Sequence, residues 1–184
     1  TPDINPFPLQ GANESTHLQK YFLAATLSSS VGIYGPIFEY MVSDAIPGKE
    51  EYMDSEKYQI RLWDWNKENK ITMLISKINQ IRKEESSLQQ TNNIEFCDTD
   101  SDQIIAYYKF NDNKENETLM IASLDAYYAK QAMVRLPLQS LGINAGQSIN
   151  VIDLITGNSY IWDKEWNFVE LHPALPFHLF KIQK

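Results

Sequence analysis

Two segments in the first half of the chain have apolar residues at helical spacing. The first predicts a helix that begins at a capping box at Thr16 and ends near Ser28, with an apolar stripe at i, i+3, i+4 and i+7 formed by Leu18, Tyr21, Phe22 and Ala25. The second predicts an amphipathic helix that ends in the region of residues 84–87, with a stripe formed by Ile71, Leu74, Ile75 and Ile78.

Between these helices the pattern changes twice. A short apolar run at residues 31–34 stops at Gly35 and Pro36, which predicts a buried strand that ends in a loop and, with the preceding helix, an α/β unit. Residues 47–69 are polar and aromatic without a steady period. Because a connection of this length without its own repeat is often functional, we expect functional residues there.

From Asn92 onward, short runs of β-branched and aromatic residues alternate with clusters of Asn, Asp, Gly and Pro. This pattern predicts antiparallel strands and hairpins, and six or more such strands predict a β-sandwich. We therefore expect two domains, residues 1–91 and residues 92–184. The expected strands are 103–110, 118–124, 132–136, 148–155, 159–162, 166–171 and 178–182.

Composition narrows the class of protein. The chain has 184 residues, of which 43% are hydrophobic and 22% charged, so it is expected to fold with a buried core. Its net charge of -8 disfavours nucleic acid and anionic lipid as partners. The single cysteine, Cys97, excludes an intrachain disulfide and fits a reducing, cytoplasmic location. No apolar run is long enough to predict a membrane span.

Residue types that carry metal, nucleotide or thiol chemistry are present without the required spacing. The three histidines are scattered, so no metal site is predicted. Residues 98–102 alternate carboxylates like the start of a calcium loop, but the later Gly and Glu are missing, which favours a polar turn. Cys97 has no nucleophile signature, and no phosphate-binding glycine loop is present.

Aromatic residues are abundant, with 4 Trp, 10 Tyr and 8 Phe. Packing is the expected role of those in β-patterned segments and near the domain junction: Trp63, Trp65, Trp162, Trp166 and Phe168. Neighbouring residues of a strand point to opposite faces. If the pairs Tyr107 with Tyr108 and Tyr127 with Tyr128 lie in strands, at most one tyrosine of each pair is therefore a candidate to face an external ligand.

Several motifs occur in a fixed order along the chain. They are TPDI at residues 1–4, YGP at 34–36, PGKEEY at 47–52, DSEKY at 54–58, RLWD at 61–64, DLITG at 153–157 and WNFVEL at 166–171. Their joint spacing resembles the carboxy-terminal portion of the α-1,4-glucan:maltose-1-phosphate maltosyltransferase family, which lies in the α-amylase superfamily. This resemblance covers essentially the whole chain and is far more specific than any single motif.

The resemblance implies an α+β fold in which the last βα units of a (β/α)8 barrel, residues 1–91, precede an antiparallel β-sandwich domain, residues 92–184. It also implies a retaining mechanism, which uses a carboxylate nucleophile and a carboxylic general acid. Asp3 corresponds to a third acid that stabilises the transition state. The nucleophile and general acid lie upstream in the family, so this chain is expected to be a fragment that is inactive alone.

The same resemblance assigns Lys57 and Tyr58 to a loop that faces the maltosyl donor. Without it, Asp3 is an exposed terminal aspartate, and residues 56–58 are an ordinary solvated loop. A lysine ammonium can donate to several sugar hydroxyls, and a tyrosine offers a ring face and a hydroxyl, so both side chains suit a sugar site.

The family transfers maltosyl units from maltose-1-phosphate to the non-reducing ends of α-1,4-glucans. It uses no organic cofactor and no essential metal, and it forms homodimers. Three other interpretations remain: a non-catalytic carbohydrate-binding module, a purely structural β-domain, and another α-amylase-superfamily enzyme such as a hydrolase or a trehalose-forming isomerase. If the chain is a barrel fragment, its helical half exposes apolar surface and is expected to be partly disordered or self-associated.

Overall fold

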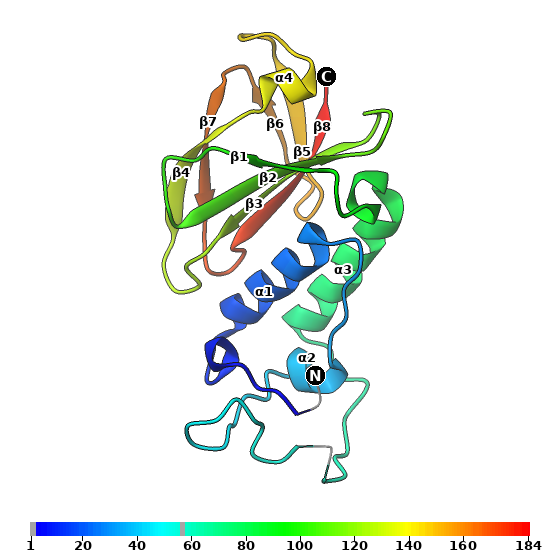
Figure 1. The fold of residues 1–184 in the computed structure, drawn as a ribbon, viewed down its shortest axis with the longest axis vertical. Helices are drawn as coiled ribbons and strands as arrows, with labels where there is room; N and C mark the ends of the chain where they lie inside the picture. Colours follow the sequence, from blue (N-terminus) through cyan, green and yellow to red (C-terminus); the bar gives the residue numbers. More distant parts are fainter. Residues whose placement is uncertain (1–2, 56–57) are drawn as a thin grey trace.

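The computed structural model of this protein describes residues 3–55 and 58–184. The helices of the first half of the chain occupy one end of the elongated molecule, and the β-strands with one short helix occupy the other (Figure 1). The helical elements that precede the strands are, in chain order, η1 (Phe7–Leu9), α1 (Glu14–Leu27), α2 (Gly35–Glu39), α3 (Lys70–Glu84) and η2 (Ser86–Gln89). Among the described residues, no helix is long and apolar enough to cross a membrane.

Both long helices begin at asparagine caps. In α1 the Asn13 Oδ1 accepts a hydrogen bond from the Thr16 backbone N–H at 2.9 Å. The prediction of a capping box at Thr16 is therefore wrong by one turn, because Asn13 already satisfies the first free N–H groups. In α3 Asn69 and Thr72 form a reciprocal capping box, and two basic residues in the last turn suit the negative end of the helix dipole.

The predicted buried strand at residues 31–34 is wrong. These residues form no regular structure, and Ile33 is 37% exposed. Four apolar residues are too few to specify a strand, and no strand of the described chain pairs with them. Pro36 instead lies in the first turn of α2, where its fixed φ favours a helix start.

The strands follow α3 and η2 and form two antiparallel sheets. The larger sheet has the order β1-β2-β3-β8-β5-β6, and the smaller one pairs β4 with β7. The hairpins predicted at residues 103–124 and 148–162 are confirmed as β2 with β3 and β5 with β6. The bounds are β1 (Ile94–Cys97), β2 (Ile104–Phe110), β3 (Glu117–Ser123), β4 (Lys130–Arg135), α4 (Leu138–Leu141), β5 (Ile149–Asp153), β6 (Ser159–Trp162), β7 (Trp166–Leu171) and β8 (Phe177–Gln183).

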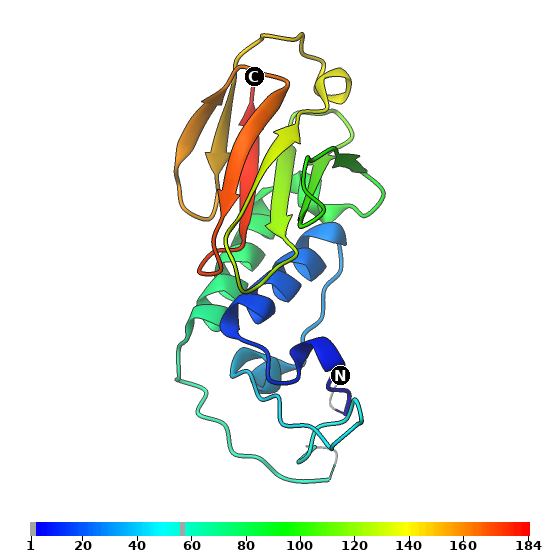
Figure 2. The same ribbon diagram turned by 90° about the vertical axis from the view of Figure 1, so that its left-hand side faces the viewer.

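The larger sheet is covered on both faces, as Figures 1 and 2 show. One face packs against β4 and β7 and encloses a core that includes Tyr108, Val134 and Val169. The other face packs against α1 and α3, where the rings of Phe22 and Phe177 stack with centroids 4.1 Å apart. The C-terminal half is thus a β-rich sandwich, and the helices lie on its outer face.

Tyr107 and Tyr108 lie in different cores, as their alternation along β2 requires, and both are 0% exposed. Neither ring is therefore accessible to an external ligand, which is consistent with the prediction of at most one such tyrosine in this pair. A partly buried ion pair also joins the helices to the sheet, because the Lys181 Nζ lies 2.9 Å from a Glu85 carboxylate oxygen. The Asn116 amide donates to the other oxygen of this carboxylate.

Candidate functional site

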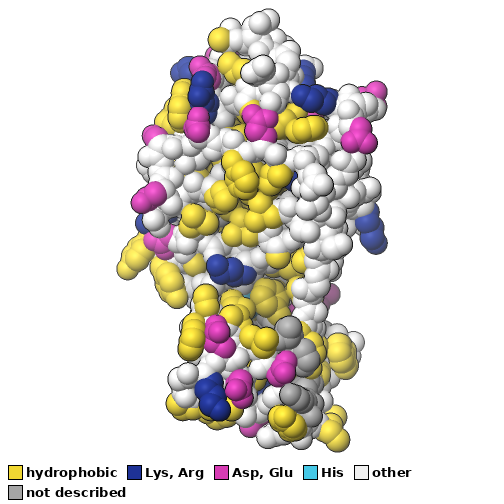
Figure 3. Space-filling model, viewed as in Figure 1, with side chains coloured by type: hydrophobic (Ala, Val, Ile, Leu, Met, Phe, Trp, Pro, Cys, Tyr) yellow, Lys and Arg dark blue, Asp and Glu magenta, His cyan; other side chains and the backbone are white. Residues whose placement is uncertain are grey.

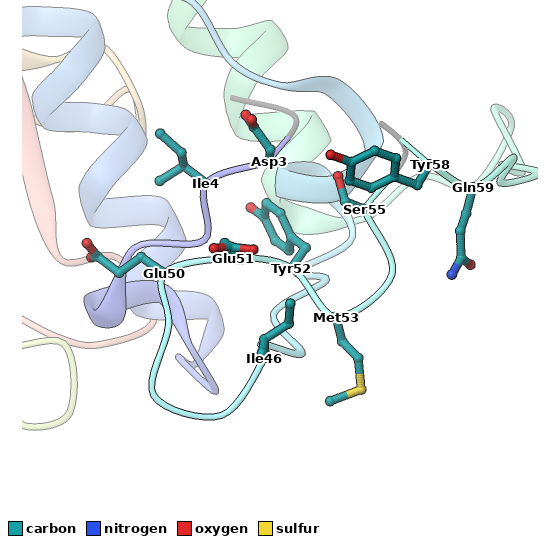
Figure 4. Close-up of a pocket in the computed structure, with 10 residues that line it drawn as sticks. All are labelled: Asp3, Ile4, Ile46, Glu50, Glu51, Tyr52, Met53, Ser55, Tyr58 and Gln59. Atoms are coloured by element: carbon teal, nitrogen blue, oxygen red, sulfur yellow. The ribbon is translucent and has the colours of Figure 1, made fainter.

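A cavity of about 550 Å³ lies at the helical end of the molecule, away from the sandwich. The N-terminal segment and the connection after α2 form its walls (Figure 4). Carboxylate, hydroxyl, amide and apolar side chains line it: Asp3, Ile4, Ile46, Glu50, Glu51, Tyr52, Met53, Ser55, Tyr58 and Gln59. The predicted residues Asp3 and Tyr58 therefore share one cavity, although they are far apart in the sequence.

Hydrogen bonds hold the N-terminal segment against the connection. The Asn5 N–H donates to the Glu50 carbonyl oxygen at 3.1 Å, and the Phe7 N–H donates to a Glu50 carboxylate oxygen at 2.9 Å. The Asn5 side chain is buried and donates to the Ser43 carbonyl oxygen at 2.8 Å. These bonds fix the backbone on both sides of the cavity, so the position of Asp3 depends on a small network rather than on a free chain end.

The wall that carries Glu50, Glu51 and Tyr52 is a tight turn. The Ile46 N–H donates to the Glu51 carbonyl oxygen at 2.9 Å, and Gly48 adopts a φ of 75° that a glycine reaches without strain. Tyr52 is 8% exposed, and burial raises the pKa of its hydroxyl. The Tyr52 hydroxyl therefore stays neutral at physiological pH and can donate a hydrogen bond.

The cavity is rich in hydrogen-bond acceptors. Three carboxylates line it, those of Asp3, Glu50 and Glu51. In Figure 4 the hydroxyl end of the Tyr58 ring points toward the side on which Asp3 lies. Carboxylates accept hydrogen bonds and tyrosine hydroxyls donate or accept them, so this lining suits the uncharged, hydroxyl-rich part of a ligand.

The third predicted site residue, Lys57, lies outside the described residues. Sequence reasoning gave no role to Glu50, Glu51, Tyr52 or Gln59, which line the cavity. The signal was present, because Glu50, Glu51 and Tyr52 fall in the motif PGKEEY, and Gln59 directly follows the motif DSEKY.

His17, His178 and Cys97 lie outside the cavity, and their contacts are with groups that belong to the folded core and its edges. His17 is buried, which lowers its pKa, and its Nδ1 lies 3.0 Å from the Asn13 carbonyl oxygen. The His178 Nδ1 lies 2.9 Å from a buried Asp153 carboxylate oxygen. Burial raises the pKa of the Cys97 thiol to about 12, which leaves it unreactive. Within residues 3–55 and 58–184, no group of three or more His, Cys, Asp or Glu side chains could hold a metal ion.

The aromatic residues of the β-strands were expected to pack in the core, but not all of them do. Trp162 is 7% exposed and packs in the core, whereas Trp166 is 36% and Phe168 58% exposed. Both lie on β7, in which exposed and buried residues alternate along the whole strand. Trp166 and Phe168 occupy exposed positions, and Val169 occupies a buried one. Their position in the alternation therefore puts them on the outer face.

Other aromatic expectations are also corrected. Tyr127 and Tyr128 are 64% and 72% exposed, because they lie in the loop after β3 and not in a strand. Trp65 is 73% exposed, whereas Trp63 is half-buried and its ring lies near Tyr40. Packing therefore accounts for only some of these side chains.

Several known proteins are similar to this chain. Residues 96–182 match the family described as "GLGE, C-terminal". The whole chain is similar to enzymes named alpha-1,4-glucan:maltose-1-phosphate maltosyltransferase. It is 39% identical to that of Chlorobaculum tepidum over 99% of this chain and 28% of the relative, and 40% identical to that of Methylacidiphilum infernorum over 100% and 28%. For Corynebacterium glutamicum the identity is 41% over 94% of this chain and 26% of the relative.

Solved structures show the same fold at low sequence identity. A maltogenic alpha-amylase, AmyB from Thermotoga neapolitana, superposes with a TM-score of 0.68 at 14% identity, covering 96% of this chain and 38% of that protein. The alpha-amylase of Geobacillus thermoleovorans gives a TM-score of 0.62 at 13% identity, covering 92% and 33%. The chain thus spans less than a third of the length of the relatives it matches by sequence.

Proposed function

We propose that this chain, which resembles the C-terminal part of the α-1,4-glucan:maltose-1-phosphate maltosyltransferases over its whole length and matches their C-terminal domain family at residues 96–182, serves in such an enzyme. The enzyme would transfer maltosyl units from maltose-1-phosphate to the non-reducing ends of α-1,4-glucans with retention. The observation that carries this proposal is the cavity that Asp3 and Tyr58 line together.

In the proposed enzyme, Asp3 holds sugar hydroxyls and favours the oxocarbenium-like transition state, while Lys57 and Tyr58 position the maltosyl donor. The nucleophile and the general acid belong to an upstream part of the protein, so the chain alone carries no activity. Three carboxylates in one cavity support a sugar ligand, since carboxylates accept hydrogen bonds from sugar hydroxyls.

The proposed architecture assigns residues 1–91 to the end of a (β/α)8 barrel and residues 92–184 to the sandwich domain. Exposed apolar side chains support it, because the rest of a barrel would cover them: Leu62 is 97%, Ile60 96% and Trp65 73% exposed. In Figure 3 apolar side chains at this lower end of the molecule lie among acidic ones. The parent enzyme is proposed to be a cytoplasmic homodimer that needs no organic cofactor or essential metal.

Phosphate release from maltose-1-phosphate in the presence of a maltooligosaccharide tests this function. We expect activity only when the chain is extended upstream to the full length of its relatives. In that protein, Asp3→Asn should lower kcat by about a hundredfold or more, because a preorganised transition-state contact is lost. Tyr58→Phe and Lys57→Ala should mainly raise KM for the donor.

Glu115→Gln is the matched control, because Glu115 is an exposed carboxylate in the β2–β3 turn, outside the cavity. Phosphate release that survives Asp3→Asn, or that the short chain catalyses by itself, would contradict the proposed roles. Equal turnover of maltose in place of maltose-1-phosphate would favour a hydrolase or an isomerase.

A further inference from the structure

The outer face of the β4–β7 sheet carries an apolar strip between polar ends. Strand alternation turns three cross-strand pairs outward, because the residues between them are buried: Arg135 with Trp166, Met133 with Phe168, and Gln131 with Glu170. Phe168 is 58% exposed, and Trp166 is 36% exposed. β4 and β7 lie side by side on the face turned toward the viewer in Figure 2.

Both ends of the strip hold hydrogen-bonding groups in fixed positions. At one end the Arg135 Nε donates to a Glu165 carboxylate oxygen at 2.6 Å, and its Nη1 donates to Asp98 at 3.1 Å. At the other end the Gln131 amide donates to a Glu170 carboxylate oxygen at 2.7 Å. Each end thus presents both donors and acceptors beside an aromatic surface.

A hollow continues the strip past Arg135. It has a volume of about 440 Å³, and its walls include Arg135, Glu165 and Asp98 together with the 61% exposed ring of Phe96. Backbone and side chains of the α4 segment close it, among them Gln139 and Ser140. Because Arg135 borders both surfaces, the strip and the hollow form one continuous site, which we call the outer-face site.

We propose that the outer-face site binds an α-1,4-glucan chain, independently of the cavity that contains Asp3. Sugar rings can stack their C–H faces on Trp166 and Phe168, while their hydroxyls donate to the carboxylates and accept from Arg135 and Gln131. The choice of an α-glucan among polysaccharides rests on the function proposed above.

Charge argues against the other partners that use exposed aromatics. The carboxylates of Asp98, Glu165 and Glu170 border the site in a chain of net charge -8, which repels a nucleic-acid backbone or an anionic lipid. A neutral polyhydroxyl chain meets no such repulsion. It also matches the paired donors and acceptors, since each hydroxyl can serve as either.

The test uses the full 184-residue chain with glycogen and maltoheptaose as ligands. We expect glycogen embedded in a native gel to slow the chain, and calorimetry to detect maltoheptaose binding. Trp166→Ala and Phe168→Ala should each raise Kd about tenfold, because each removes one stacking surface. Phe168→Tyr keeps a ring and should retain binding. Trp65→Ala removes a more exposed ring elsewhere and should change nothing.

Circular dichroism and the urea midpoint verify that each variant is folded. The proposal is overturned if glycogen does not retard the chain, if Trp65→Ala weakens binding as much as Phe168→Ala, or if dextran binds as well as glycogen. It is also overturned if sedimentation shows a dimer that Phe168→Ala dissociates, since a second copy would then occupy the face.

Failure here is distinguishable from failure of the proposed enzymatic function. In the upstream-extended enzyme, Trp166→Ala combined with Phe168→Ala should raise KM for glycogen several-fold and leave phosphate release with a short maltooligosaccharide unchanged. Glycogen retention by the 184-residue chain requires no phosphate release, so this binding can hold even where the proposed enzymatic function fails.

Discussion

At the scale of single residues, Lys109 is the least expected side chain. It lies in β2 with 0% exposure, and its Nζ donates to the Gln90 carbonyl oxygen at 2.6 Å and to the Thr26 carbonyl oxygen at 3.3 Å. Burial, with a smaller contribution from the nearby Arg82, lowers the pKa of Lys109 to about 8. The folded protein therefore releases this proton earlier than the unfolded chain does.

This pKa gives a pH dependence of defined sign. Between about pH 8 and pH 10.5 the unfolded state binds more protons at Lys109 than the folded state, so the free energy of unfolding should rise with pH. The full contribution is of order 3 kcal/mol. Urea unfolding from pH 7 to pH 9.5 should show a more positive slope for the native protein than for Lys109→Met. Parallel slopes would mean that Lys109 keeps its ordinary pKa.

Single residues also show where sequence reasoning reaches its limit. Asp3 and Tyr58 came from motifs, and no local pattern could show that they line one cavity, because distant hydrogen bonds such as that from Asn5 to Glu50 create it. Trp166 and Phe168 were expected in the core because large aromatics usually are. Their alternation with Val169 indicates instead that they lie on the face of β7 opposite to the core, a conclusion that their hydrophobicity alone does not give.

At the scale of elements, the sequence predicted the helices and hairpins whose formation depends on residues that are close together in the chain. The long helices and both hairpins were predicted because apolar periodicity and turn residues specify them over adjacent residues. The strand at residues 31–34 failed because a strand needs a partner that its own sequence does not supply. Likewise, the pairing of β4 with β7 as a separate sheet depends on packing across the sandwich.

The cap of α3 allows a prediction at this scale. The Asn69 Oδ1 accepts from the Ile71 and Thr72 N–H groups at 2.8 Å and 3.0 Å, and its amide donates to the Glu39 carbonyl oxygen at 2.9 Å. Asn69→Ala should lower the free energy of unfolding by about 1–2 kcal/mol in urea titrations. Asn69→Asp keeps the cap acceptor and should lose less. Asn113→Ala, in an exposed turn, is the control, and an equal loss there would rule out a specific capping effect.

At the scale of the whole molecule, helices and sheet share a core that crosses the predicted boundary between residues 91 and 92. Phe22 of α1 stacks on Phe177 of β8, and Met120 and Leu179 pack in the same cluster as Ile78 of α3. Because burial of such side chains supplies much of the stability of a small domain, we expect both halves to unfold together.

Residues 92–184 produced alone test this coupling. Without α1 and α3, the sheet face that carries Tyr107, Met120, Phe177 and Leu179 meets water, which should cost about 5 kcal/mol or more. The shortened chain should bind a hydrophobic dye and self-associate in sedimentation, and its urea midpoint should fall far below that of the intact chain.

In the intact chain, Phe177→Ala should lower the free energy of unfolding by about 3–5 kcal/mol, with helix dichroism and tryptophan fluorescence changing together. If residues 92–184 keep the intact urea midpoint, or if the two signals separate, the sandwich folds independently and the shared core contributes little to its stability.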